Sequence, residues 1–380
     1  MPSPEPPGRR AALPADDSDP PADGPAPVQG RISRRKVALR VVLLSITALS
    51  LYLLAPSLIR VFGQWRKLED INPVWFLVMA LLEAGSFACV WYLFHVAIRD
   101  AGWFAIATAQ LASNAVSRVV PGGAAAGGAV QYKMLATSGA DPAAAASALT
   151  AVSLISTATV FALPLLSLPA IIGGTPVPNG LAQAAWIGAG AFLVMFAVGV
   201  VALRTDRPVR FTGALIERFL AFVRRSGPPA GTLPDRLVVE RDRIKVSLGR
   251  RWVRAVAAAV GNWGLDYLAL LAALTAVGAH PDPSLVLLAF TAAAVLSMIP
   301  ITPGGLGFVE AGLTATLALA GVSAGDAAVA TLAYRLVSYW LPLPAGAVAY
   351  WLFARRYHVR DDGGTLIDTV QSATASPPGR

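Results

Sequence analysis

Six ionisable side chains lie inside apolar stretches of this sequence, where a charge is costly and usually functional. They are Glu83, Arg118, Lys133, Asp266, Glu310 and Arg335. Charged groups in such surroundings pair with one another, line a polar cavity or bind a charged substrate. The sequence shows no activated nucleophile and no cluster of metal ligands. We therefore expect binding and charge compensation, with no catalytic residues, no metal and no cofactor.

Glu83 and Asp266 occupy nearly equivalent places before two Pro-Gly-Gly turns. Glu83 lies 38 residues before the first turn and Asp266 lies 37 residues before the second. Two interpretations stay open. The carboxylates take part in proton or cation coupling, or each one forms an ion pair with a buried Arg or Lys.

Glu310 and Arg335 lie at matched depth in neighbouring apolar segments. With a rise of about 1.5 Å per residue, both lie roughly 12–15 Å below the outer surface of a bilayer, near its midplane. We expect the two side chains to pair or to share a cavity. A structural salt bridge between the second hairpin and the last span is the alternative to a substrate site.

Arg118 and Lys133 flank the first Pro-Gly-Gly turn. Lys133 is expected to extend its long side chain to the cytoplasmic surface. Arg118 is too close to the tip of the turn to do so. A guanidinium binds phosphate and carboxylate oxygens with two parallel hydrogen bonds, so Arg118 is a candidate for binding an anionic headgroup.

The composition indicates a polytopic helical membrane protein. Hydrophobic residues make up 55% of the 380 residues and charged residues only 14%, and the mean hydropathy is +0.59. Soluble proteins carry nearer a quarter charged residues. The single cysteine, Cys89, excludes an intrachain disulfide.

Long apolar windows predict about six full spans, at roughly 37–62, 73–98, 145–171, 184–203, 252–277 and 327–353. Four shorter windows, at 104–119, 127–138, 284–299 and 306–320, form two pairs. Each pair is interrupted by Pro-Gly-Gly and is predicted to form a re-entrant helical hairpin. If the hairpins are ordinary short spans instead, the count is eight. Residues 1–36 and 356–380 are expected to be disordered tails around one transmembrane domain at 37–355.

The two hairpins repeat at a constant interval. Pro121-Gly122-Gly123 is followed by Gly139, and Pro303-Gly304-Gly305 is followed by Gly321, so the two segments superimpose at an offset of 182. This indicates an internal duplication, with one repeat at about 73–171 and the other at about 252–353. Interrupted helices in duplicated halves are typical of secondary transporters, because their tips line a polar site.

The distribution of basic residues predicts the sidedness. Thirteen of the 31 Lys and Arg residues fall between Arg204 and Arg254, against five Asp or Glu. The positive-inside pattern places this connecting loop, 204–251, and both termini in the cytoplasm. The two repeats then have opposite orientations. Because the excess charge lies between spans, it argues against nucleic acid as a partner and for attraction to anionic lipids.

Several motifs resemble the lysylphosphatidylglycerol synthase transmembrane family, the flippase-like membrane domain. The stretch Ile299–Glu310, in the second hairpin, is similar to the signature of that family. The resemblance covers about residues 37–355. The other similar motifs are Gly321-Val322-Ser323, Tyr334-Arg335-Leu336, Trp340-Leu341-Pro342, Val120-Pro121-Gly122-Gly123, Gly127-Gly128 and Tyr132-Lys133. The sequence departs from the commoner first motif at Ala124–Ala126, and Lys133 stands where Arg is frequent.

This resemblance implies a stand-alone lipid flippase-like protein of the cell membrane. Members of that family are thought to move anionic, aminoacylated or polyprenyl-linked lipids, and those that make aminoacyl-lipids carry a further soluble domain. The alternatives are a membrane-embedded lipid-modifying enzyme or synthase partner, and an assembly protein without a transported substrate. Membrane lipids are the expected partners, with a homo-oligomer or a separate lipid-synthesising protein as further partners. Substrate-binding or transport residues are expected among Arg118, Gly122, Gly123, Lys133, Pro303, Gly304, Gly305, Glu310 and Arg335, with coupling at Glu83 and Asp266.

Overall fold

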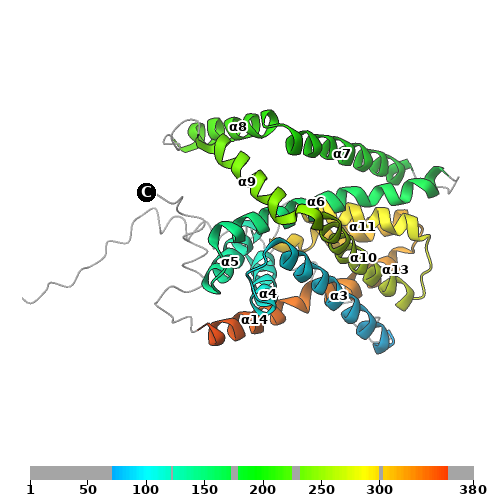
Figure 1. Cartoon of the computed structure of the whole chain (residues 1–380). Helices are drawn as coiled ribbons and strands as arrows, with labels where there is room; N and C mark the ends of the chain where they lie inside the picture. Colours follow the sequence, from blue (N-terminus) through cyan, green and yellow to red (C-terminus); the bar gives the residue numbers. More distant parts are fainter. Residues whose placement is uncertain (1–70, 121–122, 173–178, 225–231, 299–302, 358–380) are drawn as a thin grey trace, which may run out of the picture. The chain divides into compact units, whose positions relative to one another are not determined.

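The chain folds into helices throughout the part that the structure describes. The computed structural model describes residues 71–120, 123–172, 179–224, 232–298 and 303–357, and every regular element in these ranges is helical (Figure 1). All of them belong to one compact unit, Ser45–Arg380. The all-α prediction is confirmed. The predicted first span at 37–62 and most of both predicted tails lie outside the described residues.

Five segments in the described ranges are long and apolar enough to cross a membrane. They match the predicted spans after the first one. Their helices are α3 (Pro73–Ala97), α6 (Pro142–Ile172), α7 (Asn179–Arg204), α10 (Trp252–Ala276), and α13 (Ala324–Arg335) continued by η3 (Leu336–Trp340) and α14 (Pro342–Arg356).

Local sequence signals set the starts of several helices. At α3, the Asn72 side chain accepts a hydrogen bond from the Val74 amide, and Pro73 occupies the first helical position. At α13, the Ser323 hydroxyl accepts from the Asp326 amide. These are the usual N-cap and N1 residues, because they satisfy or remove the amides that a helix start leaves unpaired.

The four short apolar windows form two helical hairpins. The first contains α4 (Trp103–Val119) and α5 (Gly123–Thr137); the second contains α11 (Pro283–Ser297), a 3-10 turn η2 (Pro303–Gly305) and α12 (Phe308–Leu319). The two helices of each hairpin pack against each other. The predicted interruption at both Pro-Gly-Gly turns is confirmed, whereas re-entry into the membrane from one side stays a prediction.

Both hairpins end in the same backbone motif. Gly139 and Gly321 adopt φ values of 94° and 91°, which favour glycine. The Ala140 amide donates to the Leu135 carbonyl at 3.2 Å, and the Val322 amide donates to the Leu317 carbonyl at 3.1 Å. These paired turns, each closing a helix with a left-handed glycine, recur at the offset of 182.

Contacts between the repeats are reciprocal. Helices α3 and α10 pack against each other, α4 of the first repeat packs against α14 of the second, and α11 of the second packs against α6 of the first. At the offset of 182, α4 corresponds to α11, and α6 corresponds to α13 with α14. The contact of α4 with α14 is therefore equivalent to the contact of α11 with α6. This exchange is the pattern expected of two repeats related by an approximate two-fold axis. The orientation of that axis to the membrane stays a prediction.

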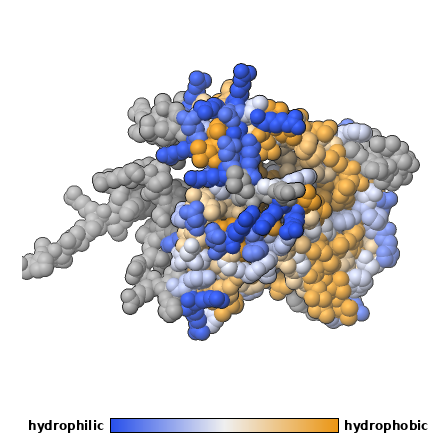
Figure 2. Space-filling model, in the orientation of Figure 1, coloured by the Kyte–Doolittle hydropathy of each residue, from blue (hydrophilic) through white to orange (hydrophobic). Residues whose placement is uncertain are grey.

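In the described residues, the connecting loop at 204–251 contains helices. It forms α8 (Arg207–Arg224), α9 (Thr232–Leu248) and a short 3-10 turn, η1 (Gly249–Arg251). Arg241 fixes α9 to the end of α7, donating to the carbonyls of Ala202 and Thr205 at 3.1 Å each. Figure 2 shows hydrophilic residues gathered over α8 and α9, and hydrophobic residues over α7.

The last predicted span, 327–353, is interrupted rather than continuous. Leu336–Trp340 form a turn of π-helix, in which the Leu341 amide donates to the Leu336 carbonyl at 3.1 Å. The following residue, Pro342, has no amide hydrogen to donate to the Ser338 carbonyl one turn earlier. The span therefore presents backbone carbonyls that need another donor, which is typical of π-bulges at functional sites.

Helices α4 and α5 pack closely at Gly127 but not at the neighbouring Gly128, and this predicts different responses of the two glycines to alanine. A Cβ at Gly127 would lie 2.6 Å from the Ser113 carbonyl oxygen, whereas a Cβ at Gly128 would meet nothing within 4 Å. Gly127→Ala should lower the free energy of unfolding in detergent by about 1–3 kcal/mol. Gly128→Ala, the matched control, should be neutral or stabilising by up to about 1 kcal/mol. Equal effects would contradict the close packing.

Candidate functional site

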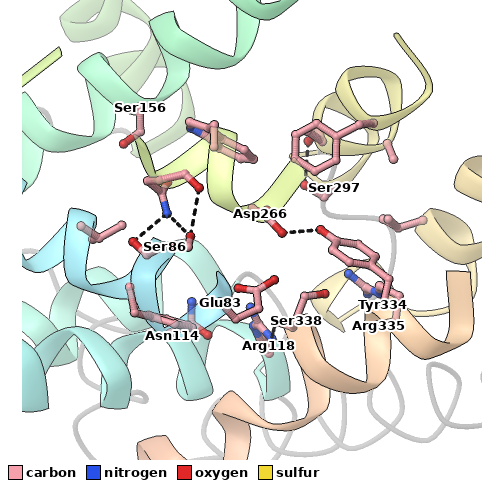
Figure 3. Close-up of a pocket in the computed structure, with 18 of the residues that line it drawn as sticks. Glu83, Ser86, Asn114, Arg118, Ser156, Asp266, Ser297, Tyr334, Arg335 and Ser338 are labelled. Carbon is pink, nitrogen blue, oxygen red and sulfur yellow. Dashed lines mark hydrogen bonds between the residues drawn. The ribbon is translucent and has the colours of Figure 1, made fainter. Parts of the chain in front are cut away.

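A polar cavity of about 330 Å³ lies between the two repeats (Figure 3). It lies at the lower end of the volumes that small-molecule sites occupy, about 300–1,000 Å³. Helices α3, α4 and α6 of the first repeat contribute to its lining, as do α10, α11, α12, α13 and η3 of the second. Its polar lining residues are Glu83, Ser86, Gln110, Asn114, Arg118, Ser156, Asn262, Asp266, Ser297, Tyr334, Arg335 and Ser338.

The cavity brings the two predicted coupling carboxylates together. Glu83 on α3 and Asp266 on α10 both line it, and their carboxyl groups interact electrostatically with each other. The Tyr334 hydroxyl donates a 2.6 Å hydrogen bond to Asp266 Oδ1. Within the described ranges, neither carboxylate has an Arg, Lys or His nitrogen within 4.0 Å. The described residues therefore supply neither carboxylate with an ion pair, and proton or cation coupling stays a prediction.

Helices α3 and α10 are locked together beside these carboxylates by a pair of polar residues. The side-chain nitrogen of Asn262, Nδ2, donates to the Ser86 hydroxyl at 2.6 Å, and that hydroxyl donates to the Asn262 backbone carbonyl at 3.0 Å. Reciprocal hydrogen bonds between buried side chains fix two helices in one register. The crossing of α3 and α10 thus holds Glu83 and Asp266 at a defined separation.

Arg118, at the end of α4, contacts backbone rather than a carboxylate. Its Nη1 donates to the carbonyls of Ser338 and Tyr339 at 2.7 and 2.5 Å. These are the carbonyls of the π-helical turn, so the guanidinium supplies donors where the interrupted helix lacks them. Binding of an anionic headgroup by Arg118 stays a prediction. Arg118 lines the cavity and has no carboxylate within 4.0 Å among the described residues.

Arg335 and Glu310 form the predicted pair. Arg335 Nε donates to Glu310 Oε1 at 2.8 Å, and both side chains are largely buried, at 12% and 15% exposure. The other carboxylate oxygen of Glu310 accepts from the Gly307 amide at 2.6 Å and so caps α12. Arg335 Nη2 lies 3.4 Å from the Gly304 carbonyl at the tip of the second hairpin. The pair therefore ties α13 to this hairpin while Arg335 lines the cavity.

Tyr339 connects the two arginines and was not predicted from the sequence. The Arg118 and Arg335 guanidinium carbons lie 4.8 and 4.4 Å from the centre of its ring, within the range of cation–π attraction. Its hydroxyl donates to the Arg118 backbone carbonyl at 3.1 Å. The aromatic ring thus holds both cations on the same side of the cavity without neutralising either.

The remaining predicted residues lie at the hairpin tips or away from the cavity. Gly304 and Gly305 have φ values of 60° and 71°, and a Cβ at Gly304 would collide with the Tyr339 hydroxyl at 2.2 Å. Gly123 packs against Ser117, Lys133 is exposed on α5 and does not line the cavity, Pro303 begins η2, and Gly122 lies outside the described residues.

Three buried polar atoms in the cavity lining have no hydrogen-bond partner in the structure. They are Glu83 Oε1, Asn114 Oδ1 and Trp263 Nε1. Buried polar groups are nearly always paired, so unpaired ones in a cavity point to water or a polar ligand. Asn114, Tyr334 and Tyr339 were missed because they carry no charge. Their position as polar residues inside apolar windows is a sequence signal that marks them, and Tyr334 also belongs to a motif of the family resemblance.

Comparison with known proteins agrees with the predicted resemblance. Residues 37–346 match the family described as Lysylphosphatidylglycerol synthase TM region. Two proteins of Methanothermobacter thermautotrophicus, each named UPF0104 membrane protein, are 33% identical over 90 residues and 37% identical over 89 residues. These alignments cover 24% and 23% of this chain and about a quarter (26%) of each relative.

No solved structure matches this chain. The family match nevertheless covers the first repeat, most of the second and every residue that lines the cavity. It covers well over half of the 380 residues. The chain therefore belongs to the lysylphosphatidylglycerol synthase transmembrane family.

Proposed function

We propose that this protein translocates a lipid with an anionic headgroup, which enters the cavity between the two repeats. The observation that carries the proposal is the cavity itself. It is polar, it is lined in part by helices that are long and apolar enough to span a membrane, and it receives side chains from both repeats. A polar path inside an apolar bundle suits a headgroup that must cross the hydrocarbon layer while its acyl chains remain in lipid.

The charge distribution favours an anionic headgroup. Arg118 and Arg335 both line the cavity, and Tyr339 holds them beside each other. Among the described residues, Arg118 is hydrogen-bonded to neutral carbonyl oxygens and not to a carboxylate, so its charge is available to a phosphate. Guanidinium groups bind phosphate oxygens with paired hydrogen bonds, which a lysine does not reproduce. The same lining contains no predicted nucleophile, and we propose transport rather than lipid modification.

We also propose that the α8–α9 connection and both termini face the cytoplasm, and that residues 172–183 and 278–283 face outward. The basic residues of the connection support this orientation. In a Cys89→Ala background, an impermeant thiol reagent should label His280→Cys in intact cells and should not label Arg236→Cys. The reverse labelling would overturn the proposed orientation.

The function is tested by reconstituting the full-length protein in liposomes with fluorescent lipid analogues in one leaflet. The protein should accelerate transfer of a phosphatidylglycerol analogue to the other leaflet by at least about tenfold over protein-free liposomes, and a phosphatidylcholine analogue much less. Arg118→Gln and Arg335→Gln should each remove the acceleration. If wild-type protein moves neither analogue, lipid translocation is overturned. Equal transfer of both analogues would overturn the anionic preference.

A further inference from the structure

The ionisable groups around the cavity do not balance in charge. Two guanidinium groups, Arg118 and Arg335, face it, together with the carboxylates of Glu83 and Asp266. Glu310 is already paired with Arg335. With every group ionised, the set carries one net negative charge, so these groups include no spare cation that could balance a further anion.

The unbalanced charge is located at Glu83 and Asp266. Arg118 bonds backbone carbonyls, and Arg335 bonds Glu310, so neither arginine contacts these two carboxylates within 4.0 Å. The Tyr334 hydroxyl donates to Asp266, and Glu83 Oε1 is buried without a hydrogen-bond partner among the described residues. Figure 3 shows Glu83, Asp266 and Tyr334 directed into the same space.

An anionic headgroup would worsen this imbalance. A phosphate that binds beside Arg118 and Arg335 adds another negative charge to the cavity that already holds the carboxylate pair. One proton on the pair offsets the charge that the phosphate brings. Two carboxyl groups that approach each other in a poorly solvated site commonly share a proton for this reason.

We propose that the Glu83–Asp266 pair takes up one proton when an anionic lipid headgroup enters the cavity, so that lipid transport is coupled to proton movement. The proton comes from water and is held between the two carboxyl groups, and no other bond is made or broken. This inference rests on the proposed function. It assigns the coupling ion and the residues that carry it.

A proton fits this pair better than a metal cation does. A proton needs only the two carboxyl oxygens that share it, whereas a sodium ion needs several oxygen ligands around it. Among the described residues that line the cavity, the other charged or titratable groups are Arg118 on α4 and Tyr334 and Arg335 on α13, while α6 and α11 contribute only neutral residues. Glu310 and Tyr339 lie behind them, in contact with the arginines.

The proposal is tested by calorimetric titration of the purified full-length protein with a short-chain phosphatidylglycerol. Repeating the titration in buffers of different ionisation enthalpy gives the number of protons taken up per lipid bound. About one proton is expected for the wild type, and the affinity should fall by up to about tenfold per pH unit as the pH rises. The Glu83→Gln/Asp266→Asn double variant should bind lipid without proton uptake. Asp100→Asn, which removes an exposed carboxylate outside the cavity lining, is the matched control and should behave as wild type.

The outcomes separate this inference from the proposed function. Lipid binding without proton uptake in the wild type overturns the inference and leaves lipid recognition intact. Proton uptake that persists in the double variant also overturns it, because the proton then resides elsewhere. Binding that requires sodium and takes up no proton overturns it in favour of a metal cation. A wild-type protein that does not bind the lipid overturns the proposed function, and the inference falls with it.

Discussion

Glu310→Gln should destabilise this protein by about 3–5 kcal/mol, because it leaves the largely buried Arg335 without its counter-charge. The amide oxygen of Gln can still accept the hydrogen bond from the Gly307 amide, so the cap of α12 is retained. The loss therefore reports the ion pair rather than the helix start. Unfolding in detergent micelles, followed by circular dichroism, gives the free energy. A loss below about 1 kcal/mol would contradict a desolvated pair.

Arg335→Lys separates the structural role of this pair from binding of a headgroup. Lysine preserves the positive charge beside Glu310, so stability should return to within about 1 kcal/mol of wild type. It lacks the planar fork that contacts both Glu310 and Gly304. We expect a folded protein whose lipid transfer is slowed by at least about tenfold. Wild-type transfer would make Arg335 a structural residue only. Exchanging the two charges, by combining Glu310→Arg with Arg335→Glu, is a poorer control, because Glu310→Arg also removes the cap at Gly307.

Arg118→Ala should have the second largest effect. It removes the donors for the Ser338 and Tyr339 carbonyls in the π-helical turn. A buried carbonyl left unpaired costs about 1–3 kcal/mol, so the free energy of unfolding should fall by roughly 2–5 kcal/mol. The same unfolding measurement applies.

Tyr339→Phe is the matched control for this loss. It removes one hydrogen bond, from the tyrosine hydroxyl to the Arg118 carbonyl, and keeps the ring beneath both arginines. The expected loss is about 1 kcal/mol. If Arg118→Ala costs no more than Tyr339→Phe, the guanidinium does not support the interrupted helix.

The duplicated hairpins were predictable because their signals are local. Pro-Gly-Gly interrupts a helix wherever it occurs, and the glycines at 139 and 321 end helices in a backbone conformation that other residues rarely adopt. The pairing of Glu310 with Arg335 was predictable for a different reason. Few charges lie at that depth, and opposite charges inside an apolar bundle tend to meet.

The surroundings of Arg118 were not predictable from its neighbours in sequence. Its partners lie 220 residues away and depend on the π-helical turn before Pro342. Basic composition alone does not distinguish a helix from a loop in the 204–251 connection. The signal that does is the period: Phe211 and Leu215 are spaced as one face of a helix.

The central claim is that a headgroup passes through the cavity between the repeats, and filling that cavity tests it most directly. Ser156 on α6 lines the cavity, whereas Leu154 on the same helix is 62% exposed on the outer surface and does not line it. Transfer of the phosphatidylglycerol analogue should be measured in liposomes for Ser156→Trp and Leu154→Trp, after both are shown to fold. We predict that Ser156→Trp abolishes the accelerated transfer and that Leu154→Trp retains it. Equal, wild-type rates for both variants would contradict passage through this cavity.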